Sequence, residues 1–222
     1  MMKAADGISA NTAVYRRCLS NTKQTGQILL LYAEDHSGWL LPAVLKEENK
    51  TYFNKLTNLH YAKSPKPFVS GKSVHIPAVF KCPDSRLIDH DGFAYGLRVN
   101  NQSTNACINL TAQKPLRSSG SAPYLASSIT WKSAQELLLL GDSLPVAYKT
   151  NGKYMQHYYL GDNNNSQQGA ALPHFRHLGK CSMLYGDGHV KGIQQHELGD
   201  SVKPHSGWTW FNQYNVIQGS YP

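Results

Sequence analysis

The sequence has few charged residues and no long hydrophobic run. Charged side chains make up 16% of the 222 residues, well below the roughly 25% that is typical of soluble domains. Asn, Gln, Ser, Thr and Tyr must therefore supply much of the polar surface. The most apolar runs, 28–33 and 136–140, fall far short of the about 20 residues that a membrane-spanning helix needs. We expect no membrane span within the printed residues, and residues 1–6 show no hydrophobic region of a signal peptide.

The sequence also lacks the short motifs that mark common enzyme sites. It contains no P-loop, no G-x-G-x-x-G fingerprint and no G-x-S-x-G nucleophile elbow; the 118–121 segment has the composition of a turn. Asp142, Asp162 and Asp200 each follow a glycine, which predicts turn residues rather than a pair of catalytic carboxylates. We therefore predict that the protein is not an enzyme.

The apolar content is sufficient for a folded core, and the overall charge is basic. Hydrophobic residues make up 41%, and 22 Lys and Arg against 14 Asp and Glu give a formal net charge of +8. The basic residues are scattered, with no run of five and no basic and aromatic stripe. This distribution favours a solvated surface over a binding site for nucleic acid or another polyanion.

The patterning predicts an α+β fold with one long N-terminal helix. Over residues 4–36, apolar or small side chains recur at steps of three, four and seven, which keeps them on one helical face. Gly38 is placed to be the C′ glycine that ends this helix, and a weaker helical pattern covers 45–61. From residue 68 on, short β-type runs alternate with turn residues, which predicts an antiparallel sheet packed on the helix. The predicted strands are Ala78–Cys82, Phe93–Val99, Ser128–Trp131, Leu137–Leu140, Val146–Tyr148, Cys181–Gly186, His189–Ile193 and Trp208–Phe211.

The strongest local signal is a hairpin in the last quarter of the chain. Asp187-Gly188 lies between two β-type runs. Asp-Gly in this position predicts a two-residue type I′ turn, in which both central residues have positive φ.

The four cysteines, at positions 18, 82, 107 and 181, include no C-x-x-C pair. Neither a zinc ribbon nor a thioredoxin-type site is indicated. Their spacing leaves three full disulfide pairings open, and it also leaves buried free thiols open. Cys181 lies inside a predicted strand, so we expect it in the core.

The ten histidines suggest a metal site as one alternative. His174, His177 and His189, with Asp187 between the last two, could form a mixed nitrogen and oxygen site. However, the spacing of His174 and His177 lacks the i, i+4 geometry of a helical zinc motif. We predict instead that His177 bonds to backbone or to Asp187, fixing a loop on the hairpin, and that no metal cofactor is bound.

Three separated motifs resemble one protein family, in the same order along the chain. The segment 18–26 reads C-x-x-N-x-K-Q-x-G and is followed by Y-A-x-D-x-x-G-x-x-x-P over 32–42. Residues 80–83 read F-K-C-P, before a Tyr-Gly pair at 95–96. His177, nine further residues and Asp187-Gly188 form an H-x9-D-G pattern that continues into His189. Together these residues resemble the prepilin-like, type II secretion pseudopilin-like proteins with a C-terminal H-X9-DG domain.

The resemblance implies a structural subunit of a type II secretion or type IV pilus-like assembly. Residues 1–40 would be the lower part of a spine helix, and 41–222 a globular α+β head with the H-X9-DG segment at 177–188. Family members begin with a leader cut by a prepilin peptidase, which leaves a methylated N-terminus. A hydrophobic helix then anchors them in the inner membrane, with the head in the periplasm or outside the cell. The printed sequence contains neither part. The implied partners are other pilin or pseudopilin subunits and secretion-assembly proteins.

The resemblance also bears on two cysteines. Family members often carry both the helix cysteine and the F-x-C-P cysteine, matched here by Cys18 and Cys82, and an exported setting permits disulfides. A Cys18–Cys82 bridge is therefore implied. Thr22 and Thr25 stand where the family has aliphatic residues, which implies a weaker contact between helix and sheet.

Some pseudopilins bind calcium through loop carboxylates and carbonyls. Asp142, Asp162 and Asp187 are possible oxygen donors for such an ion, although the family's calcium ligands do not map onto them.

Two other functions stay open at this level. Trp208 and Trp210, together with the basic surface, could bind a glycan or nucleic acid, which would make the protein a surface binding module. A metal-dependent hydrolase would be centred on His174, His177 and His189.

Overall fold

The computed structural model describes residues 2–45, 50–63, 76–84, 94–98, 108–110, 114–115, 133–145, 149–150, 153–154, 156, 159–160, 171–200, 210–211 and 217–218. It has the α+β class expected from the sequence. The elements are α1 (Met2–Asp35), β1 (Val44–Leu45), β2 (Lys50–Thr51), α2 (Tyr52–Asn58), the 3₁₀ helix η1 (Ala78–Phe80), β3 (Gly96–Arg98), β4 (Ile108–Asn109), β5 (Lys114–Pro115), β6 (Leu138–Gly141), β7 (Ser143–Pro145), β8 (Lys149–Thr150), β9 (Lys153–Tyr154), β10 (Tyr159–Leu160), β11 (Ala171–Pro173), β12 (Lys180–Tyr185), β13 (Val190–Gln194), α3 (Gln195–Asp200), β14 (Trp210–Phe211) and β15 (Ile217–Gln218).

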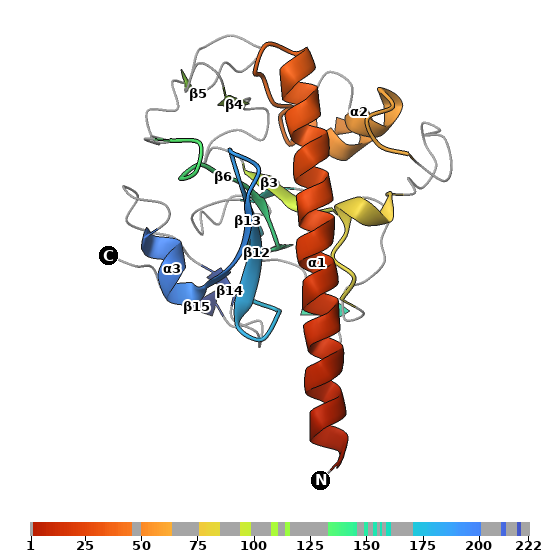
Figure 1. Ribbon diagram of the computed structural model, residues 1–222, viewed down its shortest axis with the longest axis vertical. Coiled ribbons are helices and arrows are strands. Elements are labelled where there is room, and N and C mark those ends of the chain that lie inside the picture. The colour runs from red at the N-terminus through yellow and green to blue at the C-terminus, as the bar shows by residue number, and fades with distance from the viewer. Residues whose placement is uncertain are drawn as a thin grey trace.

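The predicted N-terminal helix is confirmed as α1, a single helix of 34 residues. It runs the length of the molecule, and its N-terminal end projects beyond the sheet (Figure 1). Its C-terminal end closes with the Gly38 N–H donating to the Ala33 carbonyl at 2.7 Å. In that pattern the left-handed C′ residue is Ser37, with φ of 53°, and Gly38 follows it as C″. The sequence-based position of Gly38 was therefore wrong by one residue. Among the described helices, none combines the length and the apolar character of a membrane span.

One five-stranded sheet lies against α1, with the strand order β10-β3-β6-β12-β13. The three pairings from β3 to β13 are antiparallel, as predicted. The edge strand β10 instead runs parallel to β3, so the sheet is mixed. Strands β12 and β13 lie on one side of α1, while η1 and α2 lie on the other (Figure 1). The helix is thus held between the sheet and the segment that contains η1.

The central strands β6 and β12 are buried on both faces of the sheet, and β12 shows how the side chains divide. Cys181, Met183 and Tyr185 belong to a cluster that does not include the helix. Ser182 and Leu184 point to the opposite face, as the two-residue period of a strand requires. Leu184 packs in the larger cluster that contains residues of α1. Polar side chains placed beside Leu184 on this face therefore lie in the core between helix and sheet.

The contact between α1 and β12 is close. A side-chain carbon at Gly26 would lie 2.4 Å from Cδ1 of Leu184, so any larger residue would force the buried Leu184 side chain to move. Thr22 and Thr25 are fully buried, and their hydroxyls donate to the carbonyls of Cys18 at 2.9 Å and Val79 at 2.8 Å. The hydroxyls of both threonines are therefore satisfied inside the fold, one within α1 and one on the segment that contains η1.

Two predicted elements have a different structure. Among the described residues of 45–61, only Tyr52–Asn58 is helical, because 44–45 and 50–51 pair as a short β-hairpin. The predicted strand 78–82 instead begins as η1. There the Asn21 amide on α1 donates to the carbonyls of Ala78 and Lys81, at 3.1 and 2.9 Å. These bonds use carbonyls that a sheet partner would otherwise take.

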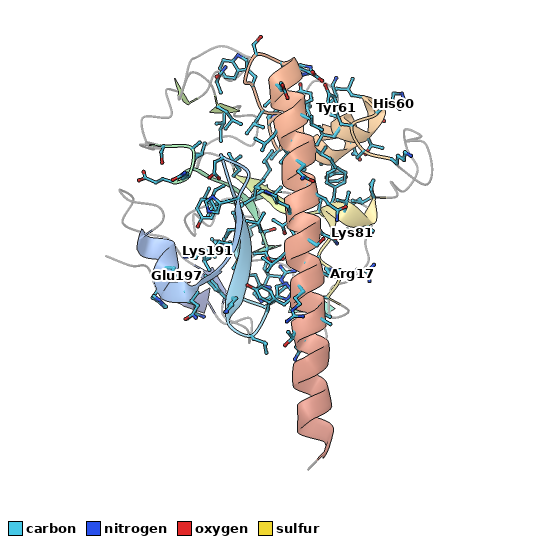
Figure 2. The ribbon with its side chains drawn as sticks, in the orientation of Figure 1. Arg17, His60, Tyr61, Lys81, Lys191 and Glu197 are labelled. Atoms are coloured by element: carbon cyan, nitrogen blue, oxygen red, sulfur yellow. The ribbon has the colours of Figure 1, made fainter. Side chains whose placement is uncertain are left out.

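The remaining predicted strands are found in part. Strands β3, β6, β12 and β13 fall within or beside their predicted ranges, and β14 covers Trp210–Phe211. The predicted strands 128–131 and 146–148, and Trp208, lie outside the described residues. Beyond β13 the chain enters α3, and Glu197 of α3 and Lys191 of β13 point toward one another (Figure 2), with Nζ 2.6 Å from Oε1.

Candidate metal centre

A buried cluster of polar side chains lies between α1 and the sheet, and Asp142 is at its centre. Asp142 joins β6 to β7 and is fully buried. Its backbone N–H donates to the Ser182 carbonyl, and its Oδ2 accepts the Ser182 N–H, both at 3.1 Å. Asp142 is therefore fixed beside β12 on the helix-facing side. The prediction of a turn residue was wrong here, because the chain after Gly141 continues through the core into β7 instead of reversing.

His177 enters the same cluster from a tight turn ahead of β12. Its N–H and carbonyl bond to the carbonyl and N–H of Lys180, at 3.1 and 3.0 Å. The two central residues, Leu178 and Gly179, have φ of 53° and 77°, the signature of a type I′ turn. The turn directs His177 Nε2 to a point 3.4 Å from Asp142 Oδ2.

The two matched cysteines complete the cluster from opposite sides. Cys18 Sγ, on α1, lies 3.6 Å from each carboxylate oxygen of Asp142. Cys82 Sγ lies 3.3 Å from His177 Nε2, and the Cys82 N–H donates to the Gln156 side chain at 2.9 Å. One ligand atom from each of Cys18, Cys82, Asp142 and His177 lies within 4.8 Å of every other. All four residues are buried, and the group could hold a metal ion.

The charges in the cluster support one another. Burial alone would raise the pKa of the Asp142 carboxyl, but Arg176 and His177 outweigh burial and hold that pKa well below its usual range. Burial lowers the pKa of His177, but the Asp142 carboxylate outweighs it and raises the value to about 9. Burial raises the pKa of the Cys82 thiol well above its ordinary value. Without a metal, the centre thus combines an ion pair with a protonated Cys82 thiol.

The implied disulfide is absent from the structure, although its two cysteines lie together. Cys18, Cys82 and Cys181 are all free and buried, while Cys107 lies outside the described residues. Cys181 is in the core, as expected, and its thiol donates to the Asp142 carbonyl at 3.5 Å. The motif resemblance therefore identified two cysteines that share a site, but in the structure they act as free thiols.

The two ends of the H-x9-D-G pattern do different things. His177 precedes β12 and Asp187 follows it, so a strand of roughly 20 Å separates their positions. Asp187 Oδ1 instead lies 2.6 Å from Nδ1 of His189, whose N–H it also accepts at 3.0 Å. The predicted bond between His177 and Asp187 is absent, and Asp142 takes the place of Asp187 as the partner of His177.

The hairpin itself is confirmed, but its turn is of another type. The Gly188 N–H donates to the Tyr185 carbonyl at 2.9 Å. The Tyr185 N–H donates to the His189 carbonyl at 3.0 Å, which closes the loop. Gly188 has φ of 82°, whereas Asp187 is not among the residues with positive φ. This is a three-residue loop ending in a left-handed glycine. The Gly188 carbonyl accepts Lys23 Nζ from α1 at 2.6 Å.

The other predicted site residues are not assembled into one site. His174 is fully buried beside Asp142, and its backbone N–H donates to the Asp142 carbonyl at 3.0 Å. His189, however, lies at the far end of β12, stacked on Tyr185. The three-histidine centre therefore does not form. Asp142 and Asp187 are likewise at opposite ends of β12, so they cannot share a calcium ion.

Two further predicted residues, Asp162 and Trp208, lie outside the described residues. Trp210 is in β14, paired with Gln218.

Sequence reasoning missed Asp142 and Arg176 as members of the centre. Both are buried, and the Arg176 guanidinium donates to the Ser143 carbonyl at 2.6 Å, with Nε 3.8 Å from Asp142 Oδ1. The available signal was a single carboxylate between apolar runs, Leu137–Leu140 before it and Leu144 after it. A carboxylate flanked in this way is buried with its strand and needs a partner.

Comparison of the chain with family models, with curated proteins and with solved structures finds no match.

Proposed function

We propose that the protein is a non-catalytic structural subunit of a pilus-like or type II secretion assembly, with α1 as its spine. The feature that carries this proposal is the division of α1 into two parts. From Cys18 to Ala33 one face of the helix is buried in the head. Toward its N-terminal end the helix extends past the sheet (Figure 1), where neighbouring subunits can pack on it.

The exposed side of α1 next to the sheet supports this role. Tyr15 packs against the head, while Ala13, Arg16 and Arg17 are exposed, so this stretch offers both small and basic side chains to a neighbour. In the proposed assembly the helix continues N-terminally into an inner-membrane anchor that a prepilin peptidase processes. The head then faces the periplasm or the exterior, and other pilin or pseudopilin subunits are the partners.

The burial of the polar cluster supports a non-catalytic role. A reacting group must reach its substrate, whereas Cys18 and Asp142 have no exposed surface. Their side chains bond to one another and to Ser182, which satisfies their polar atoms inside the fold. The centre thus fits a role in holding α1 to the sheet.

Site-specific photo-cross-linking in the native cells tests the proposal. A photoreactive amino acid replaces Arg17, on the lower half of α1, or in the control His60, at the far end of the head (Figure 2); both positions are exposed. We expect a ladder of covalent oligomers from position 17 and little from position 60. Cross-links from neither position, with the protein recovered as a soluble monomer, would contradict the fibre role.

The mass and N-terminus of the native protein, recovered from cell membranes, provide an independent test. We expect a hydrophobic segment ahead of α1 and a methylated first residue. A native protein without them would remove the membrane anchor from the proposal.

A further inference from the structure

We propose that Cys18, Cys82, Asp142 and His177 bind one zinc ion, which fastens α1 to the sheet. Zinc in proteins takes thiolate, imidazole and carboxylate ligands, and structural sites are four-coordinate and tetrahedral. The cluster supplies two sulfurs, one nitrogen and one carboxylate oxygen. Magnesium and calcium prefer sites made of oxygen alone, so the two sulfurs argue against both ions.

The spacing of the ligand atoms fits a zinc tetrahedron. With zinc–ligand bonds of roughly 2.0–2.3 Å, the ligand atoms of a tetrahedron lie roughly 3.3–3.8 Å from one another. Asp142 Oδ2 lies 3.4 Å from His177 Nε2 and 3.6 Å from Cys18 Sγ. Cys82 Sγ lies 3.3 Å from the same nitrogen. The remaining separations are all within 4.8 Å, so only small side-chain movements are needed to enclose an ion.

The surroundings provide the contacts that metal ligands usually have. Ser182 Oγ and Tyr95 Oη lie 3.4 and 3.3 Å from Cys18 Sγ, so both hydroxyls can donate to a thiolate. Ser182 also donates its N–H to Asp142 Oδ2. Such outer contacts orient metal ligands and tune their charge. They are in place on both the thiol and the carboxylate side of the centre.

The charge of the occupied site would balance. Zinc with two thiolates, one carboxylate and a neutral imidazole carries a net charge of minus one. The buried guanidinium of Arg176, with Nε 3.8 Å from Asp142 Oδ1, supplies the compensating positive charge. A buried charge without such a partner would be costly, so Arg176 makes the zinc-bound form compatible with a fully enclosed site.

The position of the four ligands indicates a structural role for the ion. They come from α1, from the segment after η1, from the junction of β6 and β7, and from the turn before β12. All four are buried, and no ligand position is left for a substrate. The ion would tie the helix to three separate segments of the head, a role that the motif resemblance assigned to a disulfide.

Metal analysis of protein purified without a histidine tag tests the proposal. We expect one zinc ion per chain, and cobalt added to chelator-treated protein should give the d–d absorption of tetrahedral cobalt bound by thiolates. Cys82→Ser should lose the zinc. Cys181→Ser is the matched control, because Cys181 is equally buried and close to Asp142 but is not one of the four ligands; it should keep one zinc per chain.

Measurements on the unaltered chain keep the test independent of variants that fail to fold. Zinc should raise the melting temperature of chelator-treated protein, and the increase should grow with the logarithm of the zinc concentration, as binding to the folded state requires, whereas magnesium and calcium should not raise it. The absence of both zinc and cobalt binding would overturn the proposal. So would a Cys18–Cys82 disulfide in peptide maps of the native protein, or another metal bound in stoichiometric amount. None of these outcomes depends on whether the protein forms fibres.

Discussion

His177 Nε2 lies 3.4 Å from Asp142 Oδ2, and this pair joins the turn before β12 to the junction of β6 and β7. The histidine of the H-x9-D-G pattern therefore acts through a carboxylate that lies outside the pattern. The aspartate of the pattern serves a separate turn at the other end of β12. The two halves of the motif can be tested separately, because each stabilises its own turn.

Replacing Asp142 should destabilise the fold strongly. In the metal-free protein, Asp142→Asn leaves the positive charges of Arg176 and His177 buried without their partner, and loss of one member of a buried ion pair costs about 3–5 kcal/mol. The control is Asp187→Asn, whose side chain is 29% exposed. We expect a change within about 1 kcal/mol for this surface pair. Urea denaturation, with a fixed m-value, measures the free energy of unfolding of both variants. Equal denaturation midpoints for the two variants would contradict the central position of Asp142.

The close approach of α1 to β12 should make Gly26 intolerant of substitution. Gly26→Ala places a carbon against the buried Leu184 side chain, and overpacking of this kind costs about 1–3 kcal/mol. The double variant Gly26→Ala with Leu184→Ala removes the clash. We expect its loss of stability to be smaller than the sum of the two single losses. Strict additivity in this double-mutant cycle would show that the two positions do not interact.

Gly188→Ala should be more destabilising than Gly179→Ala. Both glycines have positive φ, so alanine meets a backbone penalty of about 1–2 kcal/mol at either position. At Gly188 the new carbon also lies 2.7 Å from Leu30 Cδ1, whereas at Gly179 nothing lies within 4 Å. Thermal denaturation of the two variants isolates the contact with α1. A larger effect at Gly179 would contradict this packing.

The Asp187 carboxyl should titrate below its ordinary range. Burial raises its pKa, but the hydrogen bonds from the His189 N–H and ring together outweigh burial and lower it. A carboxyl whose pKa is depressed on folding contributes stability that is fully present above its unfolded pKa of about 3.9. That contribution is lost as the pH falls through the lower pKa of the folded state. Carbon-13 NMR titration reports the value directly. His189→Ala should move the pKa of Asp187 upward, and no movement would contradict the pairing.

The parts of the fold that depend on local pattern were predictable from the sequence. The helical spacing of residues such as Cys18 and Leu29 placed α1 within two residues of its observed bounds. The hairpin around Gly188 was also predicted. Its turn type was not, because the number of loop residues depends on where β12 and β13 stop pairing, which sequence patterns do not determine.

The centre was only partly predictable, because its members meet through contacts between distant segments. Cys18, Cys82 and His177 were each singled out from motifs. Asp142 was assigned to a turn because it follows Gly141. That glycine instead lets β6 pass closely against Met183, where a side-chain carbon would lie 2.2 Å from Sδ. Local residue preference could not reveal this, since Met183 comes from another strand.

The wide separation of the cluster members along the chain bears on the order in which the protein can mature. Cys18 contacts Asp142 and Ser182, which lie 124 and 164 positions further along the chain. Cys82 contacts His177, which lies 95 positions further on. Both thiols are therefore synthesised long before the partners that will enclose them. Until His177 has left the ribosome, they remain open to oxidants and to competing thiols. A fragment that stops short of that residue would keep them exposed, so thiol reactivity distinguishes an incomplete chain from a finished one.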